Sequence, residues 1–213
     1  MQNYFTDKCR DVLALSQKVN IYGVYDKKFE EYIISFEPIP NIFTGDTLAW
    51  NERANAFSTF YSFLPEGMCT SGTAIVTFKN GGLYTHNTNA IQGNFYGTQF
   101  QPELWVTLNE QPSIVKVLEG VGEETNSPWE VYAIETPDGQ LSNLIVADFR
   151  EMENNQYAGV LRDILTPNVL NPLFQGDVMR GRTALFKFRY PLTSYNKLYV
   201  VNLKFIISNP FMK

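Results

Sequence analysis

The sequence holds few side chains that could act as nucleophile, base or metal ligand. His86, in the stretch LYTHN, is the only histidine, and Cys9 and Cys69 are the only cysteines. Nucleophilic catalysis by Ser or Cys usually needs a histidine base, and a zinc site needs several His and Cys ligands. We therefore expect a structural or surface His86, two buried free thiols in a protein folded in a reducing cytosol, and no metal or cofactor site.

Carboxylates remain as the catalytic option, because glycoside cleavage needs only two of them facing one bond. The adjacent pairs are Glu30 with Glu31 and Glu123 with Glu124. Neighbouring residues of a strand point to opposite faces, and GVGEETNSP reads as a loop with solvated acids. A glycan hydrolase is therefore a weak third hypothesis, and we expect a protein that is not an enzyme.

Aromatic side chains suggest a different class of function. Trp105, Tyr84 or Trp129 could stack on a sugar ring, which makes a carbohydrate-binding or receptor-binding module the alternative hypothesis. Exposed, coplanar rings would favour that hypothesis, and burial of all three would remove it.

Basic residues concentrate in the segment MRGRTALFKFRY. On a strand, Phe186, Phe188 and Tyr190 would share one face, and Lys187 and Arg189 the other. The basic stripe could meet DNA or an acidic neighbouring subunit, and an ordinary solvated strand face is the alternative. Its four members are Arg180, Arg182, Lys187 and Arg189.

The composition indicates a globular β protein. Charged residues make up 18% of the 213 residues, hydrophobic residues 44% and aromatic residues 15%, so the chain can build a core. The formal net charge of −5 disfavours a nucleic-acid binder that relies on bulk positive charge. No apolar stretch approaches the roughly 20 residues of a transmembrane helix, and charges interrupt the opening segment where a signal peptide would be apolar.

Apolar periodicity predicts one helix, Tyr4–Lys18, and otherwise strands. The runs IYGVYD and EEYIISF should form a hairpin, and EPIPNIFTGD is the best domain boundary. We expect residues 1–45 to form the helix plus hairpin, the end of an upstream domain if the chain is a fragment. Residues 46–213 should form the main structural domain.

The main domain should be an antiparallel β-sandwich or a barrel-like sheet, because strand-like runs alternate with turn signals. Asn80-Gly81 and Pro137-Asp138-Gly139 mark tight turns. The strand from Phe57 should be an interior one, because both of its faces are bulky. Leu161–Gly181 is apolar without a strand period, which is typical of a functional or packed segment. Further strands are expected at Leu104–Leu108, Ile114–Leu118, Tyr157–Leu161, Thr183–Tyr190 and Leu198–Ile207.

Several motifs taken together resemble the muzzle and related tail-barrel proteins of crAss-like bacteriophages. They are, in order, YGVYDKKFEEYIISF, TLAWNERANAFSTFYSFLPE, GGLYTHN, NFYGTQF, LWVTLNEQPSIVKVLEGV and FREMENNQYAGVLRD, spanning about Tyr22 to Asp163. The family's segment normally lies at the end of a much longer polypeptide, whereas here Met1 lies close before it. A separate gene product and a fragment of a larger protein both fit.

The resemblance implies a virion structural protein that catalyses no reaction. It would form part of a ring in the tail or muzzle around the DNA exit channel, after synthesis in the host bacterial cytoplasm. Its partners would be further copies of itself and other tail proteins, with DNA only as passing cargo and no membrane.

Assembly of that kind needs adhesive surface, and two segments could supply it. One is the glycine-flanked QGNFYGTQF, and the other is Leu161–Gly181; intramolecular packing is the competing interpretation for both. The expected interface residues are Phe95, Tyr96, Leu170, Leu173 and Phe174.

Overall fold

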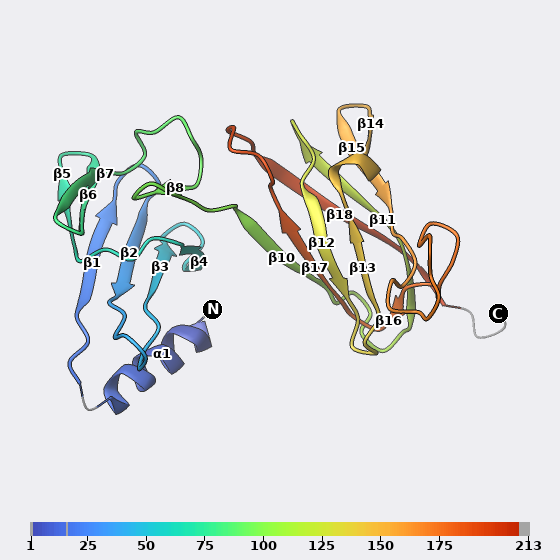
Figure 1. Cartoon of the computed structure of the whole chain (residues 1–213), viewed down its shortest axis with the longest axis horizontal. Helices are drawn as coiled ribbons and strands as arrows, with labels where there is room; N and C mark the ends of the chain where they lie inside the picture. Colours follow the sequence, from blue (N-terminus) through green and yellow to red (C-terminus); the bar gives the residue numbers. More distant parts are fainter. Residues whose placement is uncertain (1, 16, 209–213) are drawn as a thin grey trace. The chain divides into compact units, whose positions relative to one another are not determined.

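The computed structural model describes residues 2–15 and 17–208, and the chain forms two compact units (Figure 1). The units are Met1–Phe100 and Gln101–Lys213. The fold is mainly antiparallel β with one short N-terminal helix, as the sequence predicts. The boundary expected after residue 45 falls between two hydrogen-bonded strands of one sheet, so the structure divides the chain at a later point.

The first unit is built on a four-stranded antiparallel sheet in sequential order. One face carries Phe36 and Leu48, which pack against Phe5 and Val12 of helix α1 (Gln2–Ala14). The helix is amphipathic, so its apolar side covers this face. The strands are β1 (Ile21–Asp26), β2 (Glu31–Phe36), β3 (Asp46–Asn51) and β4 (Ala56–Tyr61).

The opposite face of this sheet packs against a second, three-stranded sheet. Ile33 and Ala49 from the first sheet join Ile75 from the second in one buried cluster. Asn80 and Gly81 both have positive φ, as a tight hairpin turn requires. The second sheet contains β5 (Gly67–Ser71), β6 (Ala74–Lys79) and β7 (Gly82–Thr85), and the short hairpin of β8 (Asn94–Phe95) and β9 (Thr98–Gln99) follows.

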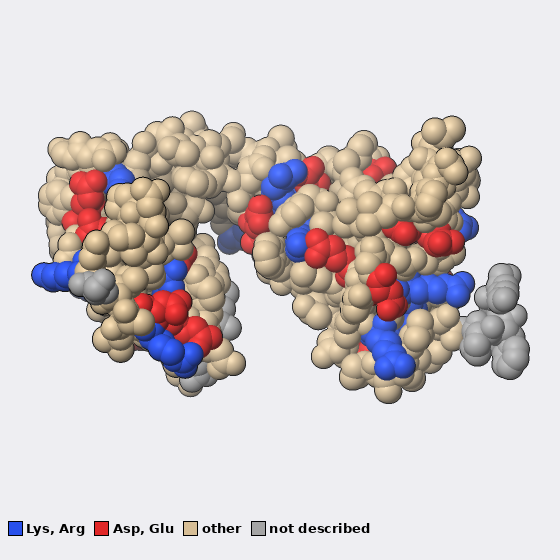
Figure 2. Space-filling view, turned by 60° about the horizontal axis from the view of Figure 1, so that its bottom comes forward, with Lys and Arg blue, Asp and Glu red and all other residues tan. Residues whose placement is uncertain are grey.

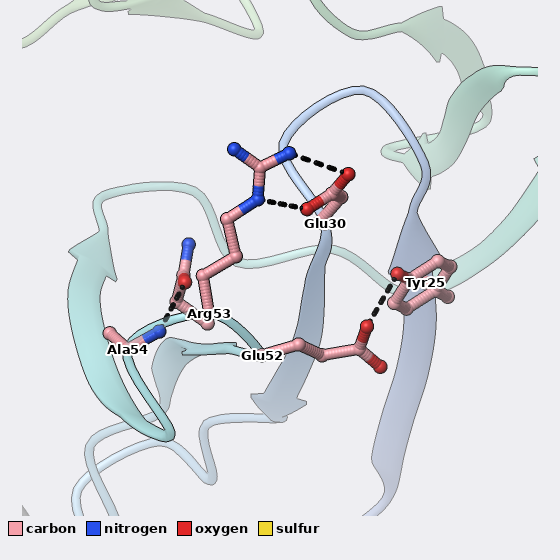
Figure 3. Close-up of polar contacts among 6 residues, drawn as sticks. Tyr25, Glu30, Glu52, Arg53 and Ala54 are labelled. Carbon is pink, nitrogen blue, oxygen red and sulfur yellow. Dashed lines mark hydrogen bonds and ion pairs between the residues drawn. The ribbon is translucent and has the colours of Figure 1, made fainter.

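Polar side chains connect two turns at one end of the first sheet (Figure 3). Arg53 forms a bidentate ion pair with Glu30, and Tyr25 donates a hydrogen bond to Glu52 at 2.9 Å. The guanidinium of Arg53 holds the pKa of the Glu30 carboxyl below its ordinary value. Because these groups face solvent, the contacts orient the turns and add little to stability.

The second unit is a sandwich of two antiparallel sheets, whose buried residues form one core. One sheet has the order β10-β17-β12-β13. These strands are β10 (Glu103–Leu108), β12 (Glu130–Glu135), β13 (Leu141–Leu144) and β17 (Ala184–Arg189).

In the other sheet, the long strand β11 pairs with β15 and β16 along one edge and with β18 along the other. A short helical turn, η1 (Val146–Asp148), leads from β13 to β14. The strands are β11 (Lys116–Thr125), β14 (Arg150–Met152), β15 (Asn155–Gly159), β16 (Arg180–Gly181) and β18 (Leu198–Ile207).

Candidate interaction surfaces

Residues 161–179 form a long ordered connection between β15 and β16, which we call the apolar loop. Asp163 is buried at its base, and one carboxylate oxygen accepts hydrogen bonds from the backbone amides of Leu141 and Leu165, both at 3.0 Å. Its backbone amide bonds the carbonyl of Asp177 at 2.9 Å. The base of the loop is therefore fixed to the sandwich.

The far part of the apolar loop is held by its own polar side chains. The side-chain oxygen of Gln175 accepts hydrogen bonds from the amides of Leu170 (2.9 Å) and Asn171 (3.2 Å). The side chain of Asn171 accepts one from the amide of Leu173 at 3.0 Å. The polar side chains of the loop thus form hydrogen bonds with the backbone of the loop.

The apolar side chains of this loop point to solvent instead. Leu170 is 91% exposed and Phe174 is 74% exposed, and Leu165 and Leu173 are each more than half exposed. Single exposed apolar residues are normal, but several on one ordered loop are typical of an interaction site. The three loop residues that the sequence analysis expects at an interface, Leu170, Leu173 and Phe174, are therefore all exposed on the same loop.

The other expected interface segment is used inside the first unit. Phe95 and Tyr96 are half-buried and pack around Phe63, at ring distances of 5.1 and 6.4 Å. The hydroxyl of Tyr96 donates a hydrogen bond to Thr77 at 2.9 Å. Intramolecular packing, the competing interpretation, therefore accounts for the half-buried positions of both aromatic residues, and their contact with another subunit stays a prediction.

The four basic residues do not form one stripe. Arg180 belongs to β16, in a different sheet from Lys187 and Arg189 of β17. Lys187 pairs with Glu135 at 2.7 Å, and Arg189 pairs with Glu130. The alternation of the segment is confirmed, because Phe186, Phe188 and Tyr190 are all buried on the core face.

The charges of this strand are thus locally neutralised, while Arg180 and Arg182 are exposed. Figure 2 shows Lys and Arg interspersed with Asp and Glu on the visible face, in small groups of mixed sign. Such a face does not provide the continuous positive field that nucleic-acid binding uses. The interpretation of β17 as a solvated strand face fits better than a DNA-facing stripe.

Trp105 is the exposed aromatic on the solvent face of the β10-β17-β12 sheet. Its side chain is 60% exposed, and its indole nitrogen donates a hydrogen bond to the hydroxyl of Tyr132 at 3.0 Å. That hydroxyl donates to Glu103 at 3.0 Å, and the ammonium of Lys187 lies 5.0 Å from the centre of the Trp105 ring. Trp129, in contrast, is buried in the core, and Tyr84 belongs to the first unit.

The sole histidine has a structural environment. The Nε2 atom of His86 lies 2.8 Å from the hydroxyl of Thr77, and its ring packs 4.5 Å from that of Phe63. Burial lowers the pKa of His86. Cys9 and Cys69 are free thiols as expected, but the expectation of burial is wrong, since Cys9 is half-buried and Cys69 is exposed.

The acidic pair Glu123 and Glu124 lies on β11 and not in a loop. Glu123 points into the core and Glu124 to solvent, as the alternation of a strand requires. Burial raises the pKa of Glu123 to about 7. In the first unit, Glu31 is buried, and burial likewise raises its pKa, whereas Glu30 lies in the turn.

A surface that the sequence analysis did not identify is the outer edge of β18. The pattern LYVVNLKFII predicts the strand correctly, but composition does not say whether a strand has one neighbour or two. Tyr199, Val200, Ile206 and Ile207 are all exposed along it. The sequence does offer one signal, which is the shortage of charged residues in this strand. Solvent-exposed edge strands usually carry charged residues, so a strand with few of them is typical of one that pairs with a partner.

No protein-family model matches the chain, and no curated protein matches it. Within residues 2–15 and 17–208, no helix combines the length and apolar character needed to cross a membrane.

Proposed function

We propose that this chain is a non-enzymatic virion structural protein of a bacteriophage, part of a ring-shaped tail or muzzle assembly around the DNA exit channel. The observation that carries the assembly role is the apolar loop, whose polar side chains bind its own backbone while its apolar side chains face solvent. The position in a phage tail rests on the resemblance of the sequence motifs to crAss-like muzzle and tail-barrel proteins.

The physical mechanism of such a module is burial of a preformed surface. Ordering a flexible loop on binding costs conformational free energy, which reduces affinity. Asp163 and Gln175 already hold the apolar loop in one conformation. Leu170, Leu173 and Phe174 can therefore be buried between subunits with little further ordering, which stiffens a ring.

Quantitative mass spectrometry of density-purified particles from cultures that express the chain tests the proposal. We expect the chain at many copies per particle, in a fixed ratio to the other tail proteins. A chain that is abundant in the lysate and missing from the particles would contradict it.

Variants of the apolar loop test the surface itself. The double substitution Leu170→Ser and Phe174→Ser should lower incorporation into particles, because it removes the largest exposed side chains of the loop. Leu192→Ser is the matched control, since Leu192 is 54% exposed on a different loop of the same unit. Equal incorporation of both variants would exclude the apolar loop as the contact.

A carbohydrate-binding or receptor-binding module of a phage tail is the second candidate, favoured by the exposed Trp105 beside Tyr132 and Glu103. An indole ring flanked by hydrogen-bonding groups can stack on a sugar ring. Titration of the protein with a panel of bacterial surface glycans should then change tryptophan fluorescence, and Trp105→Ala should abolish the change. No response to any glycan, or a response that survives Trp105→Ala, would remove this candidate.

A further inference from the structure

Among residues 2–15 and 17–208, no strand pairs with the outer edge of β18. Across residues 198–207, β18 pairs with β11 along one edge, and no other described strand pairs with it. Along the other edge, the backbone N–H and C=O groups therefore have no partner strand among the described residues. Such an edge is a template for a further strand.

β18 has only some of the devices that usually protect an edge strand: one charged residue, and a register shift between Leu198 and Val200 in its pairing with β11. The strand contains no proline, and Lys204 is its only charged residue. The ammonium of Lys204 is drawn toward Glu119 of β11, at 3.2 Å. The inward side chains of the strand, Val201, Leu203 and Phe205, are only partly buried against the core. Part of the apolar surface of the sandwich is therefore exposed along this edge.

We infer that β18 pairs antiparallel with the β18 strand of a second copy, around a two-fold axis at Leu203. In this register, Val201 faces Phe205 of the copy on the inner side, and Leu203 faces its own counterpart. On the outer side, Val200 faces Ile206. Each of these apolar side chains thus contacts an apolar side chain of the other copy. The β11-β18 sheets of the two copies join into one continuous sheet.

The charge pattern supports a second copy as the occupant. With Leu203 on the axis, Lys204 faces Asn202 and never another lysine, so the edge is complementary to itself. A two-fold contact requires this property of a single surface. Pairing of residues 199–207 would form about nine backbone hydrogen bonds, close to the roughly ten of a typical protein interface.

This contact is separate from the proposed ring. A two-fold contact closes after two copies, so a ring needs another surface, and the apolar loop remains available for that. The β18 pairing can be tested on the full chain in solution, without particles or partner proteins.

Asn202 offers a pair of variants with opposite expected signs, because it faces Lys204 of the second copy twice in each dimer. Asn202→Lys places like charges opposite each other and should weaken the dimer roughly five- to tenfold, whereas Asn202→Glu should tighten it by a similar factor. Sedimentation velocity over a concentration series measures both dimer affinities, and about 0.5 M salt should reduce the difference between the variants, because salt screens exposed charges. Asn202 is exposed, so circular dichroism and the thermal midpoint of dilute protein should match the wild type.

Hydrogen exchange of the wild-type chain gives a readout that does not depend on any variant. Those amides of residues 199–207 that point away from β11 should gain protection as the protein concentration rises, together with the dimer fraction. A wild-type chain that stays monomeric at hundreds of micromolar would overturn the inference. So would a dimer whose affinity shifts in the same direction in both Asn202 variants.

Discussion

The carboxyl group of Glu123 accepts a hydrogen bond from the backbone amide of Trp129 at 2.8 Å, inside the core of the second unit. Glu123 is 1% exposed, and its other carboxylate oxygen has no hydrogen-bond partner among the described residues. Desolvation disfavours the charged form, which is why the pKa of Glu123 is raised to about 7. A single hydrogen bond to the amide of Trp129 offsets only part of this effect.

The burial of Glu123 predicts a loss of stability as pH rises. The folded state holds the proton more tightly than the unfolded state, so the stabilisation is complete below pH ~4.5 and is lost as the pH rises through about 7. Glu123→Gln removes this titration. Relative to that variant, the wild type should lose roughly 3 kcal/mol of unfolding free energy between these limits. Urea denaturation at several pH values measures the difference.

The neighbouring acid provides the control. Glu124 is on the same strand but faces solvent, so Glu124→Gln should show no such growth of the difference with pH. A Glu123→Gln variant whose stability relative to wild type is the same at acid and neutral pH would contradict the account of the buried carboxyl.

The first unit should respond to pH in the opposite direction, through His86. Burial lowers the pKa of His86, so the stabilisation is present above the ordinary histidine pKa and is lost as pH falls toward the folded value. His86 is the only histidine of the sequence, so its ring proton signals can be followed by NMR without ambiguity. We expect a midpoint below 6.5, the ordinary value. A midpoint at that value would show that the ring is solvated, and a midpoint above it that the ring is paired with an acid.

Lys116 holds two connections of the sandwich together. Its ammonium group is buried and donates hydrogen bonds to the backbone carbonyls of Gln111 (3.1 Å), Ile114 (3.3 Å) and Arg182. Lys116→Met leaves these carbonyls without their donor and should lower the free energy of unfolding by about 2–4 kcal/mol.

Chemical denaturation compares this variant with Lys197→Met, which changes the same residue type at an exposed position of the same unit. The control should keep the wild-type midpoint. Equal midpoints for the two variants would mean that the hydrogen bonds of Lys116 do not contribute to stability.

Asp163 should control the order of the apolar loop. Its carboxylate binds the amides of Leu141 and Leu165, so Asp163→Ala should cost about 1–3 kcal/mol and loosen the loop. Hydrogen exchange should become faster across residues 161–179. Asp177→Ala is the control, because this exposed residue lies in the same loop. Loop exchange that is faster in the control than in Asp163→Ala would assign the order to other contacts.

Local patterns determined much of the fold in advance. Hairpin turns need positive φ, which Asn80-Gly81 and Gly139 supply, and the expected strands flank both turns. The bounds expected for Leu198–Ile207 match β18. These predictions succeeded because turn chemistry and side-chain alternation act over a few residues.

Features that depend on distant neighbours were not predictable in this way. The strand around Phe57 reads as an interior strand because both faces are bulky, yet β4 is at the edge of its sheet, where helix α1 covers Phe57 from one side. Phe95 has the same composition signal as Phe174, but only Phe174 is exposed. Which apolar residues are free for a partner depends on the tertiary structure, which no short window of sequence contains.

The central claim is that the chain functions by adhesion to other subunits through the apolar loop. Single-particle electron cryomicroscopy of the purified virion tests it most directly. The account predicts a ring of copies in the tail or muzzle, with Leu170, Leu173 and Phe174 buried against a neighbouring subunit. A map in which this chain is missing, or in which the same three side chains face solvent in every copy, would contradict it.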